Sequence, residues 1–246
     1  MKKHDIKKIV KESYEEIADS GCCSSCGCSG SNKEQIAKSI GYSDNEIQAH
    51  PEANLGLGCG NPTALGDITE GMTVLDLGSG AGFDCFLAAK KVGKSGRVIG
   101  VDMTKKMIQK AQENAKKYGF SNVEFRLGEI EDLPVEDNSI DVIITNCVIN
   151  LSPDKTQVFK EAHRVLKKGG KLLVSDIVLL KELSELHRKD KKLIAGCVGG
   201  AVMKDKYLEM VRKAGFSVKV LSEDTDIGSR QYNGFPLESL KIEAQK

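Results

Sequence analysis

From residue 72 onward, short apolar runs alternate with longer amphipathic segments. The apolar runs have the length of buried strands, and the segments between the earlier ones place apolar residues at helical spacing. Because strands that alternate with helices in this way form a parallel, doubly wound sheet, we expect an α/β fold whose seven-stranded, mostly parallel sheet is flanked by helices. The strands are expected at 73–78, 97–103, 123–130, 139–149, 170–178, 216–222 and 237–244, and the main helices at 83–93, 105–119 and 154–167.

The chain before this alternation has a different pattern. Residues 2–20 form a predicted amphipathic helix, a cysteine-rich loop follows, and a short helix is expected at about 33–40. Glycines and Pro62 exclude regular structure over 49–63, which we expect to lie as a loop over a site. We therefore expect residues 1–65 to be an extension that covers the site. Residues 66–246 would form the main domain, with an inserted helical region for substrate binding at about 181–212.

Composition narrows the class of protein. The chain has 246 residues and is 40% hydrophobic, which suits one core, and its 36 basic and 35 acidic side chains nearly cancel. We therefore expect no nucleic-acid partner and no membrane partner. The first residues alternate charge with apolar residues, unlike an export signal, so we expect a cytoplasmic location. In that compartment the eight cysteines would stay reduced.

A glycine-rich turn follows the first predicted strand. Gly78, Gly80 and Gly82 stand between that strand and the next helix, where glycines let a backbone approach a ligand closely. A dinucleotide fingerprint would need different spacing, and Phe83 stands directly after the last glycine. Asp76 just before the turn would repel a pyrophosphate but would suit a cationic ligand.

Two further acidic positions follow strands of the same sheet. Asp102 ends the second strand, where a carboxylate can accept hydrogen bonds from ribose hydroxyls, and Met103 beside it could cover an adenine. Ile130 and Glu131 end the third strand, where they could meet the base and its amino group. The alternative for either carboxylate alone is a helix cap or a solvated loop charge.

Together these segments resemble the class I S-adenosylmethionine methyltransferases. The resemblance rests on VLDLGSGAGFD, GVDM, GEIEDLP and a strand that ends in TNC, and it covers roughly residues 70–180. It implies a Rossmann-like sheet with an antiparallel final strand and S-adenosylmethionine as cofactor. The cofactor-binding residues that we expect are Asp76, Gly78, Ser79, Gly80, Gly82, Asp102, Met103, Ile130, Glu131 and Asn146.

The cysteines fall into two groups. Cys22, Cys23, Cys26 and Cys28 cluster near the start, with spacings that a structural zinc or an iron–sulfur cluster could use, although adjacent cysteines rarely serve one tetrahedral ion. The other four are dispersed. Of these, Cys85 lies on a helix among apolar residues, so we expect it to be a small buried side chain.

The three remaining cysteines stand at positions that can face one site. Cys147 follows the fourth strand, while Cys59 and Cys197 lie in loops rich in small residues. Each alone is more often a buried apolar residue. Three thiols that converge beside an activated methyl group would form a soft trigonal site, which favours a thiophilic acceptor over oxygen or nitrogen.

The segments that carry these cysteines, LGCGNP, TNCVINLSPDK and AGCVGGA, resemble those of the arsenite methyltransferases over roughly residues 10–235. The resemblance implies that Cys59, Cys147 and Cys197 bind trivalent arsenic as substrate, presented as arsenite or its thiol complexes. It also implies that Cys22 or Cys23 serves arsenic delivery or redox turnover with a reductant such as glutathione or thioredoxin. Asn146 could orient the cysteine loop. Longer relatives add a carboxy-terminal domain that this chain largely lacks.

Two alternatives to arsenic methylation stay open from the sequence. A methyltransferase for a quinone-type or sterol-type molecule fits the generic motifs, and a non-catalytic thiol protein that binds a metal or metalloid fits the early cluster. No resident metal is expected. Trivalent arsenic keeps a lone pair, so methylation needs no general base, and the four histidines, His4, His50, His163 and His187, are expected at the surface.

Overall fold

A computed structural model describes residues 1–20 and 30–246 of the chain. Its centre is a seven-stranded sheet in the order β3-β2-β1-β4-β5-β7-β6. Only β7 among the strands of this sheet runs antiparallel to its neighbours, β5 and β6. The predicted α/β architecture is confirmed, including the antiparallel final strand. The strands are β1 (Thr73–Leu77), β2 (Arg97–Asp102), β3 (Val123–Leu127), β4 (Ile140–Asn146), β5 (Leu166–Leu179), β6 (Ser217–Asp224) and β7 (Leu237–Gln245).

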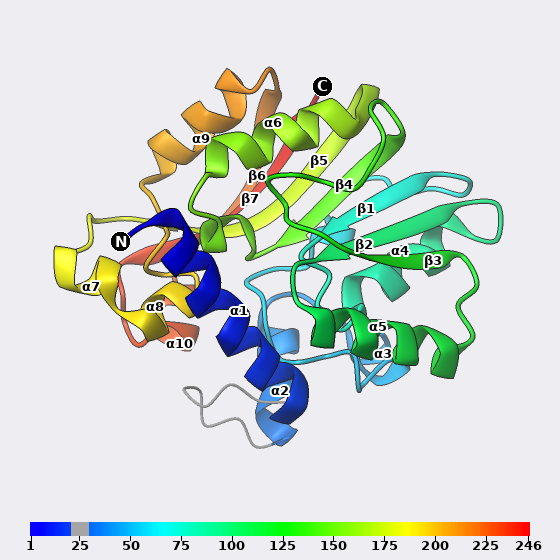
Figure 1. The fold of residues 1–246 in the computed structure, drawn as a ribbon, viewed down its shortest axis with the longest axis horizontal. Helices are drawn as coiled ribbons and strands as arrows, with labels where there is room; N and C mark the ends of the chain where they lie inside the picture. The colour runs from blue at the N-terminus through cyan, green and yellow to red at the C-terminus, as the bar shows by residue number, and fades with distance from the viewer. Residues whose placement is uncertain (21–29) are drawn as a thin grey trace.

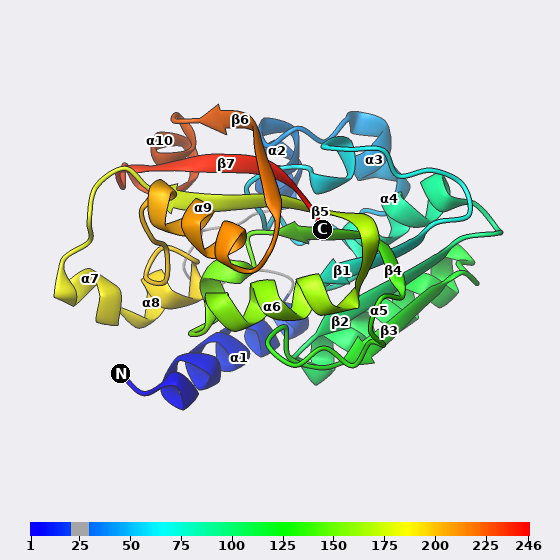
Figure 2. The same cartoon turned by 90° about the horizontal axis from the view of Figure 1, so that it is seen from above.

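Helices cover both faces of the sheet because its strands are apolar on both sides. On one face, α4 (Phe83–Val92) and α5 (Lys105–Tyr118) pack Phe86 and Ile108 against Val74 and Ile144. On the other face lie α6 (Lys155–Val165) and α9 (Lys204–Lys213), which run side by side in Figures 1 and 2. Phe159 and Tyr207 from these two helices are fully buried and meet edge to face. These two cores hold the strands in register. They therefore also set the position of the carboxyl ends of the strands.

The N-terminal segment lies across the carboxyl ends of the strands. Its helices are α1 (Lys3–Ser20), α2 (Gly30–Ser39) and α3 (Asp44–Ala49), followed by the 3-10 turn η1 (Pro62–Ala64). Helix α1 contacts α5 and α8 (Lys191–Ala195), and Figure 1 shows it in blue in front of the strand ends. Lys7 pairs with Glu129 and Glu131 after β3, so ion pairs as well as apolar contacts hold α1 in place.

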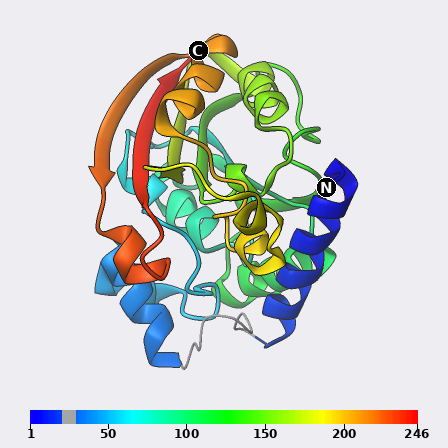
Figure 3. The same ribbon diagram turned by 90° about the vertical axis from the view of Figure 1, so that its left-hand side faces the viewer.

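Short helices close the same end from the other side. They are η2 (Ile149–Leu151), α7 (Glu185–Lys189), α8 and α10 (Ile227–Gln231). In Figure 3, α7 and α8 lie in front of the strand ends, with α1 on one side and α10 on the other. The region 181–212 is therefore mostly helical, as its pattern predicts, although its role in substrate binding stays a prediction, as does the division of the chain at residue 65. Among the described helices, none is long and apolar enough to span a membrane.

The prediction for His50 is wrong. Its side chain is buried, with 4% of its surface exposed, and packs against the rings of Phe86, Tyr118 and Phe120. Burial lowers its pKa to about 4, so the imidazole is neutral at physiological pH. The polar local sequence around residue 50 does not indicate this, because the aromatic rings come from α4 and from the end of α5, far along the chain.

Candidate active site

A cleft of about 1100 Å³ opens at the carboxyl edge of the sheet. Its walls come from α1, the glycine turn after β1, the ends of β2 to β4, and α8 and α10. This is the position at which doubly wound sheets bind ligands. Most of the residues expected from the sequence line it, namely Asp76, Gly78, Ser79, Gly80, Asp102, Met103, Ile130, Glu131, Asn146, Cys147 and Cys197.

The glycine turn leaves room and a free hydroxyl for a ligand. Gly80 has a positive φ of 50°, and a Cβ built there meets nothing within 4 Å. Ser79 Oγ is buried with no hydrogen-bond partner among the described residues. Gly82 differs, because it lies outside the cleft lining and its Cβ would meet Phe86 and Phe125 within 3 Å. A glycine at position 82 is therefore needed for α4 to pack closely on the sheet.

Asp102 is held in place by the backbone at the end of β2. Its Oδ2 accepts a hydrogen bond of 3.0 Å from Gly80 N, and its Oδ1 accepts one of 2.8 Å from Thr104 N. Burial raises its pKa, and both backbone hydrogen bonds act in the opposite direction. Each oxygen keeps a lone pair for a hydroxyl of a bound ligand. The capping alternative and the ligand-binding role are therefore compatible.

Two buried carboxylates lie close together in the cleft wall. Burial raises the pKa of Asp76, and the charge of Asp84 raises it further. The pKa of Asp84 is raised to about 6 by burial. The Cys85 thiol, which is buried as expected, donates a hydrogen bond to Asp76. A cationic ligand would relieve the repulsion between these carboxylates, as the amino group and sulfonium of S-adenosylmethionine would.

Glu131 has partners within the protein. Its Oε1 accepts a hydrogen bond of 2.7 Å from Ser152 and lies 3.3 Å from Lys7 Nζ. Helix α1 is therefore tied to one of the positions expected to meet the adenine. Ile130 and Met103 offer apolar surface beside it.

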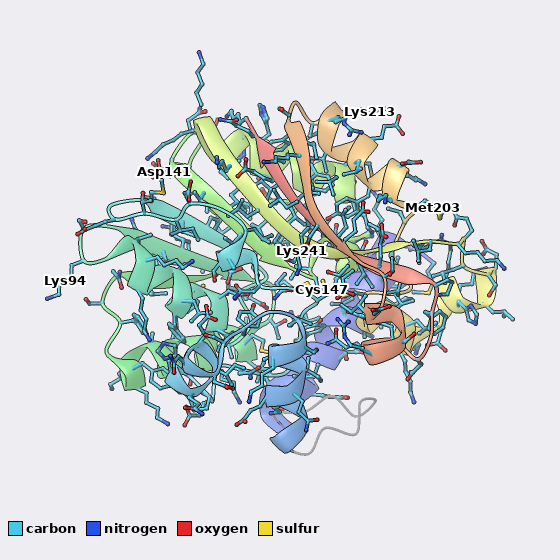
Figure 4. The ribbon with its side chains drawn as sticks, turned by 180° about the vertical axis from the view of Figure 1, so that it is seen from behind. Lys94, Asp141, Cys147, Met203, Lys213 and Lys241 are labelled. Carbon is cyan, nitrogen blue, oxygen red and sulfur yellow. The ribbon has the colours of Figure 1, made fainter. Side chains whose placement is uncertain are left out.

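The structure brings the three dispersed cysteines to the same end of the sheet. Cys147 follows β4 and Cys197 follows α8, and the Cys197 thiol donates a hydrogen bond of 2.8 Å to the Cys147 carbonyl. The Sγ atoms of Cys59 and Cys147 lie within 4.8 Å of each other and of an Asp176 oxygen. Cys147 and Cys197 line the cleft, whereas Cys59 lies outside its lining. Cys147 is buried, and Figure 4 shows it near the middle of the view, away from Lys94 and Lys213 at the periphery.

The three thiols differ in acidity. Interactions with the side chains of Cys197, Cys59 and Tyr232 lower the pKa of Cys147 well below its usual value, although burial acts in the opposite direction. Burial and the charge of Cys147 raise the pKa of Cys59, and the hydrogen bond to Cys147 together with burial raises that of Cys197. Cys147 is therefore the thiol that ionises first.

Asn146 connects the Cys59 loop to the end of β4. Its Oδ1 accepts a hydrogen bond of 3.0 Å from Cys59 N, and its Nδ2 donates one of 2.8 Å to Gly60 O. A Cβ on Gly58 would lie 2.6 Å from this amide. Glycine is therefore required for the loop to approach β4. Asn146 also donates to Tyr42, whose hydroxyl donates to Asp84, so the loop and the cofactor end of the cleft share one network.

Sequence reasoning missed three residues that surround the cysteines. Asp176 lies in β5, directly after a buried apolar run and level with the end of β4. An acidic residue at that position was the signal that could have indicated a role in the site. Tyr232 stands directly after α10, and its hydroxyl lies 3.4 Å from Cys147 Sγ. Tyr14 of α1 interacts with the side chain of Cys197. Both were hidden, because a tyrosine in a short helix or on an amphipathic face carries no local sign of its partner. Cys22, Cys23, Cys26 and Cys28 lie outside the described residues.

Comparison with known proteins gives a consistent result. A family of methyltransferase domains matches residues 68–215. The arsenite methyltransferase of Halobacterium salinarum is 43% identical, with coverage of 98% of this chain and 67% of the relative. The arsenite methyltransferase of Aquipseudomonas alcaligenes is 44% identical over 73% of this chain and 54% of its own length, so the chain spans about half of that relative.

Among solved structures, the crystal structure of an arsenic(III) S-adenosylmethionine methyltransferase from Chlamydomonas reinhardtii superposes with a TM-score of 0.67 at 33% identity. The match covers 86% of this chain and 73% of that one.

Proposed function

This chain belongs to the arsenite methyltransferases, whose methyl donor is S-adenosylmethionine, and we propose that it methylates trivalent arsenic bound by the thiols of Cys59, Cys147 and Cys197. The observation that carries the proposal is the meeting of Cys147 and Cys197 at the wall of the cleft, with the Cys59 sulfur beside Cys147. These cysteines come from three segments that are far apart in the sequence. Ordinary core packing would not require a thiol at each of them.

The residues of the cleft fit the cofactor. Asp102 would accept the ribose hydroxyls, Ile130 and Met103 would flank the adenine, and Ser79 and Gly80 would face the amino-acid part. Asp76 would be the carboxylate near its positive charge. When bound, S-adenosylmethionine supplies an electrophilic methyl group on a cationic sulfur. Helix α1 and the α7–α8 region would keep water away from that group.

Cys147 would begin the capture of arsenic. As the most acidic of the three thiols, it supplies a thiolate that displaces a ligand from an arsenic–thiol complex. Cys59 and Cys197 then replace the remaining ligands and transfer their protons to the departing thiolates. Three protein sulfurs hold the arsenic and leave its lone pair free to accept the methyl group. Because this acceptor carries no proton to remove, catalysis rests on positioning, which supplies on the order of 7–11 kcal/mol in favourable cases.

Turnover would draw on thiols outside this site. A small-molecule substrate agrees with the named relatives. We propose in addition that glutathione or thioredoxin acts as reductant, that Cys22 or Cys23 assists delivery or redox turnover, and that the protein works in the cytoplasm.

The deciding experiment follows labelled methyl transfer from S-adenosylmethionine to arsenite in the presence of glutathione. Cys147→Ser and Cys197→Ser should each abolish transfer and leave cofactor affinity nearly unchanged, because the sulfurs contact only the acceptor. Cys85→Ala is the matched control for arsenite binding, since it removes a buried thiol outside the trio. Full activity in either serine variant would refute the three-thiol site, and transfer to a quinone but not to arsenite would favour an organic acceptor.

A further inference from the structure

A carboxylate lies against the sulfur atoms on the side of β5. The Sγ atoms of Cys59 and Cys147 and a carboxylate oxygen of Asp176 all lie within 4.8 Å of one another, and all three residues are buried. Cys197 is not part of this triangle, although it adjoins Cys147. The two neighbouring thiols therefore have two different third donors available to them.

We propose that Cys59, Cys147 and Asp176 form a binding site for a divalent d10 cation such as zinc or cadmium, which holds the enzyme in an inactive state by occupying two of the arsenic-binding sulfurs. The inference rests on the proposed function for its inhibitory consequence. The cation site itself rests on the geometry of these three donors alone.

The spacing of the donors suits such an ion. Zinc binds thiolates at about 2.3 Å and carboxylates at about 2.0–2.2 Å in tetrahedral geometry, so its donors lie roughly 3.5 Å apart. Donors within 4.8 Å of one another reach that arrangement through movements on the order of 1 Å. Three protein ligands with an open fourth position are a common zinc arrangement, and Cys147 lines the cleft from which water would fill that position.

Asp176 is oriented as a metal-binding carboxylate would be. Its Oδ1 accepts hydrogen bonds of 2.9 Å from Asn150 Nδ2 and from Ile177 N. Its Oδ2 accepts one, of 3.1 Å, from the Tyr207 hydroxyl, and therefore retains a lone pair. Carboxylates that ligate metals are generally fixed by such outer hydrogen bonds.

The chemical hardness of the third donor distinguishes trivalent arsenic from a zinc or cadmium ion. Trivalent arsenic takes three soft thiolates and gains little from a carboxylate, whereas zinc and cadmium accept mixed sulfur and oxygen donors. Cys59 and Cys147 are common to both sets, so only one occupant can be bound at a time. A bound d10 cation has no nucleophilic lone pair and cannot accept the methyl group.

The test measures zinc and arsenite binding in a reciprocal pair of variants. The background is the full chain with Cys22, Cys23, Cys26 and Cys28 changed to serine, so that metal bound at the early cluster is not counted. Zinc chloride is titrated against a chromophoric chelator under a thiol-free reductant. We expect one zinc per chain, a loss of about tenfold or more in zinc affinity in Asp176→Asn, and less than about a threefold change in Cys197→Ser.

Arsenite should give the reverse result, with affinity lost in Cys197→Ser and nearly kept in Asp176→Asn. Zinc affinity that is unchanged in Asp176→Asn, or lowered equally in Cys197→Ser, would overturn the cation site and leave the arsenic proposal standing. Unchanged arsenite affinity in Cys197→Ser would instead refute the three-thiol arsenic site.

A second measurement does not depend on how the Asp176 variant folds. X-ray absorption of the zinc-loaded background protein should show two sulfur neighbours together with oxygen neighbours. A shell of three or more sulfurs would contradict the assignment of Asp176 as a ligand.

Discussion

The thiol of Cys197 donates a hydrogen bond of 2.8 Å to the carbonyl of Cys147, and both residues have left-handed backbone conformations, with φ values of 68° and 58°. Residues other than glycine and asparagine adopt this conformation rarely, and strain of this kind gathers at functional sites. The two strained turns, which follow β4 and α8, bring these two residues into contact. In the proposed arsenic site, sulfurs arranged in advance would lose less conformational entropy when arsenic binds.

The strain at Cys197 can be measured with two substitutions. Cys197→Gly should be more stable than Cys197→Ala by about 1 kcal/mol, because glycine adopts a positive φ without a steric penalty. At an ordinary position alanine would be the more stable of the two. Urea unfolding of both variants gives the order, and a more stable alanine variant would show that the turn is not strained.

Asp102 should contribute directly to cofactor affinity. Asp102→Ala is expected to weaken binding of S-adenosylmethionine by about 1–3 kcal/mol, since buried ribose hydroxyls would lose their acceptor. Isothermal titration calorimetry measures the change, and arsenite binding to the three thiols serves as the internal control. Wild-type cofactor affinity in this variant would remove the ribose assignment.

Gly58 and Asn146 should be energetically coupled. A Cβ on Gly58 would lie 2.6 Å from the Asn146 amide, so Gly58→Ala should destabilise the wild-type protein by more than it destabilises Asn146→Ala, with a difference of about 1 kcal/mol or more. Chemical unfolding of the single and double variants measures this coupling. Gly80→Ala is the matched control, because its Cβ meets nothing within 4 Å and should show no coupling to Asn146. Additive effects of Gly58→Ala and Asn146→Ala would contradict the close contact.

His50 should make stability depend on pH below neutrality. Its pKa falls from 6.5 to about 4 on folding, so the unfolded chain binds a proton between these values that the folded chain does not. The stabilisation is therefore complete above pH 6.5 and is lost as pH falls toward 4, by about 2–3 kcal/mol. His50→Phe should flatten this part of the profile of unfolding free energy against pH. An unchanged slope would assign the acid sensitivity to other groups.

The pattern of apolar runs predicts the sheet well. Buried parallel strands are apolar on both faces, so they can be recognised from the local sequence alone. It places the start of β5 too late. Lys167 to Lys171 is a polar stretch with paired glycines that suggests a turn, and yet the strand begins at Leu166. Among the extra residues, Leu166 pairs with Ile140 of β4 across an irregularity in the register, a long-range contact that local sequence does not encode.

In the site, too, some features follow from the local sequence and others depend on tertiary packing. The glycine turn and Asp102 follow from their position after strands, and Cys147 follows from the end of β4. The contact of Tyr232 with Cys147 depends on the path of the chain between β6 and β7, and the burial of His50 depends on rings from α4 and α5. These relations arise from tertiary packing, so no spacing along the chain reveals them.

Ser239 of β7 donates a hydrogen bond of 2.7 Å to the carbonyl of Cys59, across most of the length of the chain. The loop that carries Cys59 is therefore held from two strands, by Asn146 of β4 and by Ser239 of β7, and its full set of contacts forms only after β7 has entered the sheet. In the proposed three-thiol site, the fully supported arrangement of Cys59 beside Cys147 would therefore depend on β7, which comes from the far end of the folded domain.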